Sequence, residues 1–448
     1  MVSLSHHFLT PAEVRPSLSR SILADGFPLV LDLARSQGSR IVDGVSGQTY
    51  LDLFSFFASN ALGLNHPDLT SPARLAELGR AAVNKPSNSD IYTVELAEFI
   101  ATFQRVVGDP ALPHLFFVEG GGLAVENALK AAFDFKSRLN QAQGKDPGLG
   151  TKVMHLRDAF HGRTGYTMSL TNTDPVKTDR FPKFDWPRIT SPYLGHWADG
   201  RPRQVEALED QALAEAEAAF AAAPDDIAAF IAEPIQSEGG DHHLRAEFLL
   251  QMQELAHAHQ ALFILDEVQT GLGGTGTAWA YQQLGLEPDI VAFGKKTQVC
   301  GIMAGRLLDS VEDNVFQVSS RLNSTWGGNL TDMVRARLIL EVMERDGLIE
   351  RAGRLGGWLV EQLTELADRH RWLTDPRGRG LLCAVSLPST ALRDEVLRRL
   401  LARRVLALSC GDRSLRLRPA LTIERADLAE GLAELDAVLS ELEAASAL

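Results

Sequence analysis

Short apolar runs alternate with longer stretches of helical spacing through the middle of this chain, and this alternation limits the possible folds. The apolar runs have the length of buried strands and lie at 114–119, 152–158, 227–234 and 261–267. The stretches between them, such as 123–139 and 206–223, repeat apolar residues at helical intervals. Strands that alternate with helices predict an α/β fold with a mostly parallel sheet covered on both faces.

Both ends of the chain depart from this central pattern. The segment 39–55, SRIVDGVSGQTYLDLFS, predicts a hairpin with DGVSGQ as its turn. Beyond residue 330 the sequence has long amphipathic helices and then a strand-like run at 414–421. We therefore expect three parts: an N-terminal segment that joins the small domain (1–80), a large α/β domain (81–330) and a C-terminal small α+β domain (331–448).

Charge and composition exclude several classes of function. The 44 basic and 58 acidic residues give a net charge of −14, so we expect no nucleic-acid partner. There is no run of about 18 apolar residues, and the N-terminus lacks a basic segment followed by an apolar core. We expect no membrane anchor and a cytoplasmic location. The three cysteines lack zinc-like spacing and are expected to be reduced, mostly buried thiols: Cys300, Cys383 and Cys410.

Two of the predicted strands end in charged residues. The run at 261–267 ends in Asp266 and Glu267, at the edge where open α/β sheets bind their ligands. The run from Asp289 to Gly294 ends in Lys295 and Lys296. A lysine desolvated at a strand end can lose its proton near neutral pH and act as an amine nucleophile. The alternative is a pair of lysines in water and a carboxylate that caps a turn.

A third strand, at 115–119, runs into three glycines before a helix predicted from about Leu123. Glycines there let backbone N–H groups at a helix N-terminus approach a phosphate, although a plain strand-to-helix turn has the same pattern. The sequence contains no G-x-x-x-x-G-K-[ST], G-x-S-x-G or H-E-x-x-H. We expect no metal site, and we expect four histidines to lie on the surface: His242, His243, His257 and His259.

A strand-end lysine, a strand-end aspartate and a glycine-rich helix start together meet the needs of pyridoxal 5′-phosphate. From about Leu31 to Leu421 the chain resembles the class III aminotransferases. The resemblance is carried by DEVQTG with a following Trp and PDIVAFGKK, and by AFHGRTGY (159–166), EPIQSEGG (233–240) and STWGGN (324–329). It implies a fold-type I enzyme, a pyridoxal phosphate cofactor and a homodimer with active sites at its interface.

The resemblance also implies roles for single residues. Lys295, rather than Lys296, would carry the cofactor, and Asp266 would pair with the nitrogen of its ring. The remaining cofactor contacts would come from Phe160 stacked on the ring, Gln269 at the phenolic oxygen, Gly121 and Gly122 at the phosphate, and Ser324 and Thr325 reaching the phosphate of the neighbouring subunit. Most members have S-G-[TS]-E where this chain has Gly120–Leu123. The contacts there are therefore expected from backbone N–H groups only.

Four further segments are similar to the family members that transfer the ε-amino group of L-lysine: NKPSNSDIY (84–92), RFPKFDWPRI (180–189), GKKTQVCG (294–301) and SRLNSTWGGN (320–329). This likeness implies that L-lysine and 2-oxoglutarate give 2-aminoadipate 6-semialdehyde, which cyclises, and L-glutamate. It places Asn323 in the substrate site.

Two differently shaped substrates need separate carboxylate contacts. We expect Arg163 to bind the distal carboxylate, because a guanidinium fork suits bidentate carboxylate binding. The resemblance to the class III aminotransferases implies that Arg416 binds the proximal carboxylate, with Glu238 as its removable partner. Ornithine and 4-aminobutyrate aminotransferases are the near alternatives. A decarboxylase or racemase with the same cofactor, or a non-enzymatic or nucleotide-binding protein in which Lys295 and Asp266 are structural, also remains open.

Overall fold

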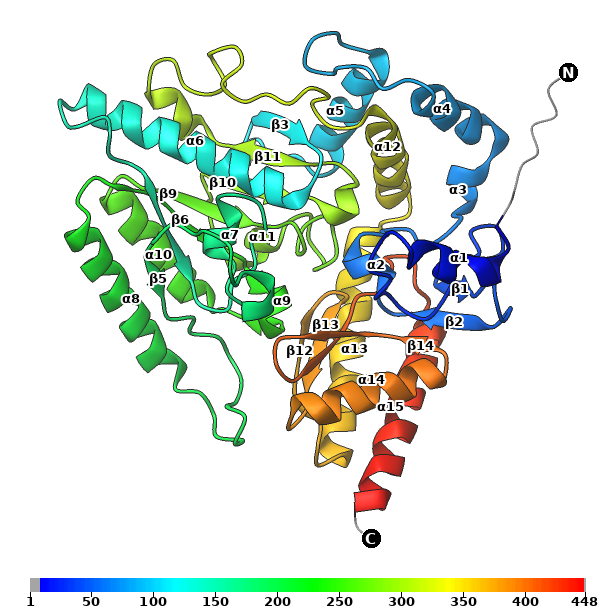
Figure 1. Ribbon diagram of the computed structural model, residues 1–448. Coiled ribbons are helices and arrows are strands. Elements are labelled where there is room, and N and C mark those ends of the chain that lie inside the picture. Colours follow the sequence, from blue (N-terminus) through cyan, green and yellow to red (C-terminus); the bar gives the residue numbers. More distant parts are fainter. Residues whose placement is uncertain (1–8, 447–448) are drawn as a thin grey trace, which may run out of the picture.

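The computed structural model describes residues 9–446, and a seven-stranded sheet forms the centre of the larger part of the chain (Figure 1). Its strand order is β3-β11-β10-β9-β6-β4-β5. Only β11 runs antiparallel to its neighbours, so the prediction of a mostly parallel sheet is confirmed. The bounds are β3 His114–Val118, β4 Lys152–Leu156, β5 Arg188–Ile189, β6 Ile227–Ala232, β9 Leu262–Asp266, β10 Ile290–Phe293 and β11 Cys300–Ala304.

Helices cover both faces of this sheet, because the inner strands are apolar on both sides. Every residue of β6, β9 and β10 is buried. In β9, Phe263 and Leu265 face one core with α10, whereas Leu262 and Ile264 face the other with α6. Figure 1 shows α6 on one side of the sheet and α8 and α10 on the other. Their bounds are α6 Gly121–Ala142, α8 Val205–Ala222 and α10 Ala246–Ala258.

The two ends of the chain meet in a three-stranded sheet. The predicted hairpin forms from β1 (Arg40–Val42) and β2 (Thr49–Asp52), and β14 (Val405–Leu406) lies parallel to β2. A four-stranded antiparallel sheet follows the order β12-β13-β16-β15. Its strands are β12 Thr374–Arg379, β13 Leu382–Ser386, β15 Leu408–Cys410 and β16 Ser414–Leu417. The strand expected at 414–421 thus ends at Leu417, ahead of Pro419.

The remaining elements are mostly helical. The longer helices are α1 Pro11–Leu18, α4 Pro72–Ala82, α5 Val94–Val106, α12 Leu330–Arg345, α13 Leu348–Arg369, α14 Thr390–Ala402 and α15 Arg425–Ser446. The short ones are α2 Ser55–Ala58, α3 Pro67–Thr70, α7 Thr167–Leu170, α9 Ser237–Gly240 and α11 Ala280–Leu284, and a small ribbon joins β7 Ile235–Gln236 to β8 His242–His243. No helix between residues 9 and 446 is long and apolar enough to cross a membrane.

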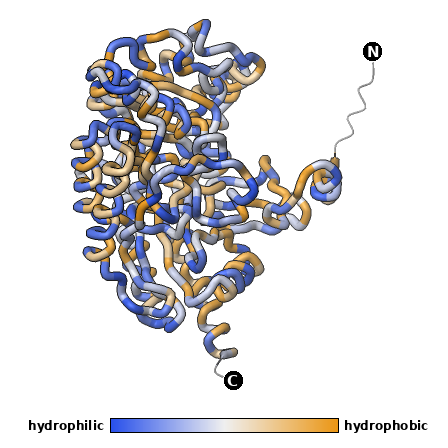
Figure 2. The backbone as a smooth tube through the Cα atoms, turned by 60° about the vertical axis from the view of Figure 1, so that its left-hand side comes forward, coloured by the Kyte–Doolittle hydropathy of each residue, from blue (hydrophilic) through white to orange (hydrophobic). Residues whose placement is uncertain are grey.

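The segment around α1 extends from the body of the molecule (Figure 2). None of the residues of α1 is buried. Ile22 and Leu23, which follow it, are 56% and 83% exposed. Apolar side chains on a projecting segment are typical of a surface that another chain covers.

The expectation of four surface histidines is wrong for two of them. His257 and His259 are exposed, but His243 is buried and the His242 ring stacks on Tyr193 at a centroid distance of 3.4 Å. Pairing of β8 with β7 draws this polar pair into the interior. Among the described residues no group of three or more His, Cys, Asp or Glu side chains could hold a metal ion. The three cysteines are free, and Cys383 and Cys410 are buried.

Candidate active site

A cavity of about 450 Å³ lies at the carboxyl ends of β9 and β10, beside the start of α6. The structure brings seven of the predicted site residues to its wall: Gly121, Gly122, Phe160, Arg163, Asp266, Gln269 and Lys295. They come from four separate segments of the chain. The edge of the sheet is therefore the place where the predicted chemistry can assemble.

Lys295 opens the short 3₁₀ turn η2 (Lys295–Thr297) directly after β10. Its φ is 51°, in the left-handed region, and strained backbone of this kind is concentrated at functional sites. Burial and then the nearby charge of Arg416 lower the pKa of the Lys295 amine to about 8, against the opposing charge of Asp266. A substantial fraction of the amine is therefore neutral near pH 8.

A second strained turn borders η2. All four residues of α2, Ser55–Ala58, have positive φ values between 38° and 66°. A left-handed turn costs roughly 1–2 kcal/mol per residue, so surrounding contacts must hold it. The Ser55 hydroxyl donates to the Arg418 carbonyl oxygen, and the Gln298 side chain donates to the Ser59 carbonyl oxygen at 2.6 Å. These contacts connect the turn to the segment that follows η2 and to the residue that follows β16.

Asp266, the last residue of β9, is held in one orientation by two contacts. Its Oδ2 lies 2.8 Å from Nδ1 of His161, and its Oδ1 accepts the N–H of Val268 at 3.0 Å. The side chains of His161 and Asp266 are both buried. Nε2 of His161 has no hydrogen-bond partner among the residues that the structure describes. The neighbouring Glu267 is also buried, but it accepts from the backbone N–H of Tyr281 at 2.8 Å and does not line the cavity.

Glu233 is a second carboxyl in the cavity, and sequence reasoning missed both it and His161. Glu233 accepts the backbone N–H groups of Phe160 at 2.9 Å and Ser237 at 3.2 Å. Burial, and then the charge of Asp266, raise its pKa well above the usual range. Both residues stand inside motifs that matched the family, in AFHGRTGY and EPIQSEGG, so their polar type within those motifs was the available signal.

The glycine-rich helix start fits a phosphate. Helix α6 begins at Gly121 rather than at Leu123, and Gly120 has a φ of 110°. A Cβ on Gly121 would lie 3.0 Å from Cγ1 of Val268, and one on Gly122 would lie 3.2 Å from Cγ2 of Thr164. A side chain at either position would thus crowd Val268 or Thr164 at the turn whose backbone N–H groups meet the cavity. Together with a buried lysine and an oriented carboxylate, this is the set of groups that pyridoxal phosphate requires.

Three charged side chains meet beside this cavity. Arg416, on β16, is 1% exposed, and its Nη2 donates to Oε2 of Glu238 at 2.7 Å. The other Glu238 oxygen, Oε1, accepts from Nζ of Lys177 at 2.6 Å. Burial opposes ionisation of Glu238, but the charges of Arg416 and Lys177 outweigh it and lower the carboxyl pKa. Gln269 joins the group by accepting from Nη1 of Arg416 at 3.3 Å.

Lys296 does not line the cavity that Lys295 lines. It is 2% exposed, and its Nζ has no hydrogen-bond partner within residues 9–446. A Cβ on Gly274 would lie 2.8 Å from that nitrogen. Burial and then the charge of Arg418 lower the pKa of Lys296 to about 7. The second lysine is therefore a buried amine rather than a solvated one.

The segment STWGGN lies outside the cavity of its own chain. Ser324 is half-buried and accepts the N–H of Gly327 on Oγ at 3.1 Å, whereas Thr325 is exposed. Asn323 lines a separate cavity of about 730 Å³ together with Asn88. The structure of one chain thus does not bring these three predicted residues to Lys295.

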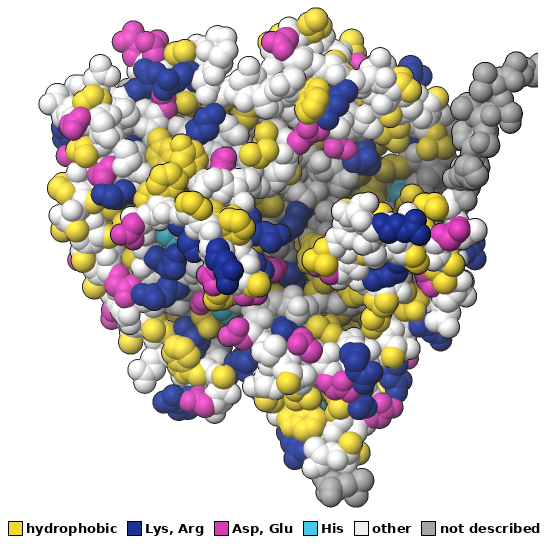
Figure 3. Space-filling model, viewed as in Figure 1, with side chains coloured by type: hydrophobic (Ala, Val, Ile, Leu, Met, Phe, Trp, Pro, Cys, Tyr) yellow, Lys and Arg dark blue, Asp and Glu magenta, His cyan; other side chains and the backbone are white. Residues whose placement is uncertain are grey.

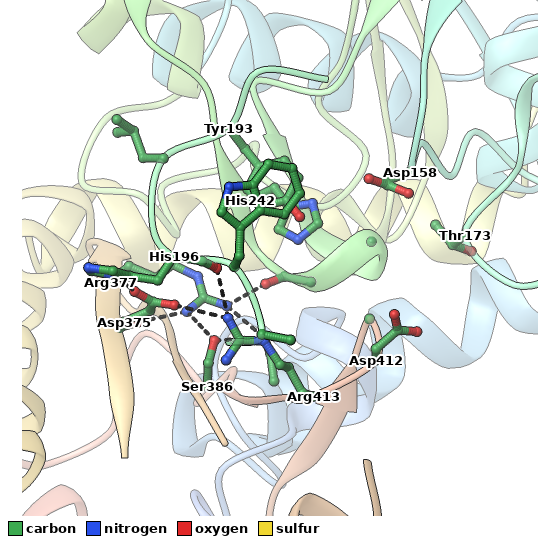
Figure 4. Close-up of a pocket in the computed structure, with 17 residues that line it drawn as sticks. Asp158, Thr173, Tyr193, His196, His242, Asp375, Arg377, Ser386, Asp412 and Arg413 are labelled. Carbon is green, nitrogen blue, oxygen red and sulfur yellow. Dashed lines mark hydrogen bonds and ion pairs between the residues drawn. The ribbon is translucent and has the colours of Figure 1, made fainter. Parts of the chain in front are cut away.

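Another cavity, of about 310 Å³, lies between the large domain and the four-stranded sheet (Figure 4). In it Arg377 donates to the carbonyl oxygens of Gly240, at 2.5 Å, and Asp241, at 2.8 Å. Arg413 donates to the carbonyl oxygen of His196 at 2.8 Å. The two bonds from Arg377, on β12, anchor the turn that carries Glu238 to the four-stranded sheet, and the bond from Arg413 anchors the loop at His196. The face of the molecule seen in Figure 1 has a hollow near its centre in the space-filling view, with Lys and Arg side chains beside it (Figure 3).

Comparisons with known proteins agree with this geometry. The family model for class-III aminotransferases matches residues 23–439. An L-lysine-epsilon aminotransferase from Mycobacterium tuberculosis (strain ATCC 25618 / H37Rv) is 60% identical over 98% of each chain, and one from Amycolatopsis lactamdurans is 58% identical over 96% of each chain. A solved structure of lysine aminotransferase from M. tuberculosis has a TM-score of 0.94 and 60% identity over 96% of this chain and 99% of that chain. The chain belongs to the class-III aminotransferases.

Proposed function

We propose that this protein transfers the ε-amino group of L-lysine to 2-oxoglutarate, with pyridoxal 5′-phosphate held on Lys295. The products are 2-aminoadipate 6-semialdehyde, which cyclises to a piperideine carboxylate, and L-glutamate. The observation that carries the proposal is the cavity that joins a buried amine, an oriented carboxylate and a glycine-lined helix start. The names and high identity of the relatives support the choice of lysine.

Each residue of the cavity has a separate task in this proposal. Bound pyridoxal phosphate supplies an electron sink that makes the carbon bearing the substrate amine acidic. Asp266, fixed by His161, holds a proton on the ring nitrogen and so keeps the ring electron-poor. Lys295, once the substrate amine has replaced it on the cofactor, would be free to act as the general base and acid for the proton on the substrate carbon, as its lowered pKa allows. Phe160, in the wall of the same cavity, would cover the ring, and Gln269 would bind its phenolic oxygen.

Two differently shaped substrates must use this one cavity. Arg163, an exposed residue of the wall, binds the distal carboxylate of either substrate through its guanidinium fork. Arg416 binds the carboxylate next to the reacting amine or keto group, which only glutamate and 2-oxoglutarate have. While lysine is bound, Glu238 pairs with Arg416 and neutralises its charge, because an unpaired buried charge is costly.

The proposal includes a homodimer. Ser324 and Thr325 would contact the phosphate bound by the partner subunit, and Asn323 its substrate. Exposed apolar side chains near these residues and at the N-terminal segment support an interface: Tyr92 is 78% exposed, Leu23 is 83% and Trp326 is 41%. The free thiols support a cytoplasmic location. Dilution to monomer should release cofactor, and a cofactor-saturated monomer would contradict this arrangement.

An amino-donor screen with 2-oxoglutarate tests the function. L-Lysine should give glutamate and the cyclised product in equal amounts, ahead of L-ornithine and 4-aminobutyrate. Release of CO₂, or product without glutamate, would indicate a decarboxylase or another reaction of the same cofactor. The purified protein should show a visible absorption band that borohydride bleaches. Absence of this band would indicate a protein in which Lys295 is structural.

A further inference from the structure

We propose that Lys177 is a specificity-determining residue that holds the carboxylate of Glu238 when a dicarboxylate substrate takes Arg416. The inference rests on the proposed function, because it explains how the Arg416 site is opened for 2-oxoglutarate and closed for lysine. Lys177 ends the short turn η1 (Pro175–Lys177), far from Glu238 in the sequence. It lies outside the motifs on which the family resemblance depends.

The carboxylate of Glu238 is divided between two cations. Oε2 accepts from Arg416 at 2.7 Å and Oε1 accepts from Lys177 at 2.6 Å. The two cations differ in their surroundings, because the side chain of Arg416 is 1% exposed and that of Lys177 is 22% exposed. Glu238 therefore lies between a buried cation on the substrate side and a partly solvated cation on the other side.

The groups around Glu238 allow its side chain to move while the rest stays in place. Its carbonyl oxygen accepts the N–H of Gly411 at 2.9 Å, which fixes the backbone. Arg416 is held independently by the carbonyl oxygen of Ser237 and by Gln269, each at 3.3 Å. Rotation of Glu238 toward Lys177 would thus leave Arg416 in position with Nη2 free. A carboxylate of the substrate can then take the vacated place.

Lys177 is suited to hold the displaced carboxylate. A half-buried carboxylate without a cation would lose the partners that keep it ionised, and its displacement would be unfavourable. Nζ of Lys177 also lies 5.4 Å from the centroid of the Phe160 ring and 3.5 Å from Oγ1 of Thr173, and these contacts position the amine. Lys177 therefore favours the state in which Arg416 is free, and its removal should strengthen the pairing of Glu238 with Arg416.

The test is the binding of glutarate, a dicarboxylate that lacks the keto group, to the cofactor-loaded enzyme by calorimetry. Lys177→Met should weaken glutarate binding about tenfold, the size expected for one partly exposed charge-assisted contact. Lys177→Arg keeps the cation and should stay within about twofold of wild type. The matched control is Lys183→Met, an exposed lysine of the same segment that donates to the Thr178 carbonyl oxygen, and it should not change binding.

A double-mutant cycle separates this role from direct contact with the ligand. In the Glu238→Ala background the further change Lys177→Met should alter glutarate affinity by less than about twofold, because no carboxylate remains to be held. The half-reaction with L-lysine should stay near wild type in Lys177→Met, while the KM for 2-oxoglutarate rises.

Two results would overturn the proposal: unchanged glutarate binding in Lys177→Met, or an equal loss in the Glu238→Ala background. Failure of the proposed function gives a different result. If the wild-type enzyme leaves L-lysine unreacted while the coupling between Lys177 and Glu238 persists, the amino donor is wrong and the role of Lys177 stands.

Discussion

His161 and Asp266 form a buried pair in which Nδ1 of the imidazole lies 2.8 Å from Oδ2 of the carboxylate. The contact fixes the orientation of Asp266 at the end of β9, where the ring nitrogen of the cofactor is expected. A carboxylate that turns away can no longer hold the proton of that nitrogen. Asp266 therefore depends on a residue that sequence reasoning did not single out.

The first prediction concerns this pair. Asp266→Asn should slow the single-turnover half-reaction with lysine by orders of magnitude, because a neutral amide does not stabilise a protonated ring. His161→Phe should slow it by about 10- to 100-fold, through loss of orientation. His257→Phe, an exposed histidine of α10, is the control. Absorption of the bound cofactor should persist in all three variants, and near-normal rates in Asp266→Asn would refute the assignment.

The second prediction concerns Lys296. Lys296→Met should retain turnover, whereas Lys295→Met should lose it. Lys296→Met should also raise the free energy of unfolding at neutral pH by about 1–3 kcal/mol, because an unpaired buried amine is replaced by an apolar chain of similar length. Lys183→Met, on the surface, should leave stability unchanged.

The pH dependence of this stabilisation follows from the lowered pKa of Lys296, about 7 in the folded chain against 10.5 for an ordinary lysine. Between these values the unfolded chain binds a proton that the folded chain does not. Wild-type stability is therefore lost as the pH falls from about 10 to 7, and Lys296→Met should remove this part of the slope. Thermal unfolding midpoints at pH 7.5 and 9.5 measure it; an equal difference between variant and wild type at both values would argue against a neutral buried amine.

Much of the site could be predicted from the sequence because its residues follow local patterns. Asp266 and Lys295 stand where apolar runs end, and the three glycines stand where a strand becomes a helix. The contact between Lys177 and Glu238 has no such pattern, since it joins η1 to α9 through the folded chain. Similarly, β11 was not expected, because its residues follow the lysine segment without a clear turn signal.

Some features could not be predicted because they arise from strand pairing in the folded chain, and other expectations stay predictions. His242 and His243 form a polar pair that reads as exposed, yet β7 draws them inside. β14 joins the hairpin of β1 and β2, a contact between chain ends that no local window contains. The division of the chain at residues 80 and 330 stays a prediction, as do the roles of Ser324 and Thr325 at a dimer interface.

The third prediction concerns the glycine-rich helix start. Gly122→Val should weaken binding of pyridoxal phosphate to the apoenzyme by more than about tenfold. Its Cβ would already lie 3.2 Å from Thr164 Cγ2 and 3.6 Å from Gly162 Cα, so the branched side chain would shift the helix start and the N–H groups that are expected to face the phosphate. Gly357→Val in α13, where no atom lies within 4 Å, is the control. Equal cofactor affinities, measured by titration of the apoenzyme, would place the phosphate elsewhere.

The fourth prediction concerns Glu238. Glu238→Ala should leave Arg416 unpaired during the lysine half-reaction and so raise reactivity toward α-amino groups relative to the ε-amine. Glu247→Ala, on the first turn of α10, is the control. Single-turnover rates with L-lysine and L-glutamate measure the ratio. A ratio and a regiochemistry equal to wild type would show that Glu238 does not gate the carboxylate site.

In the proposed reaction the ε-nitrogen of L-lysine is the group that is transferred. The most direct measurement is turnover of L-lysine labelled with ¹⁵N at the ε position in the presence of 2-oxoglutarate, with both products analysed by mass spectrometry. The label should appear in L-glutamate, and the cyclised product should retain only the unlabelled α-nitrogen. Label retained in the lysine-derived product, with unlabelled glutamate, would contradict the proposed reaction.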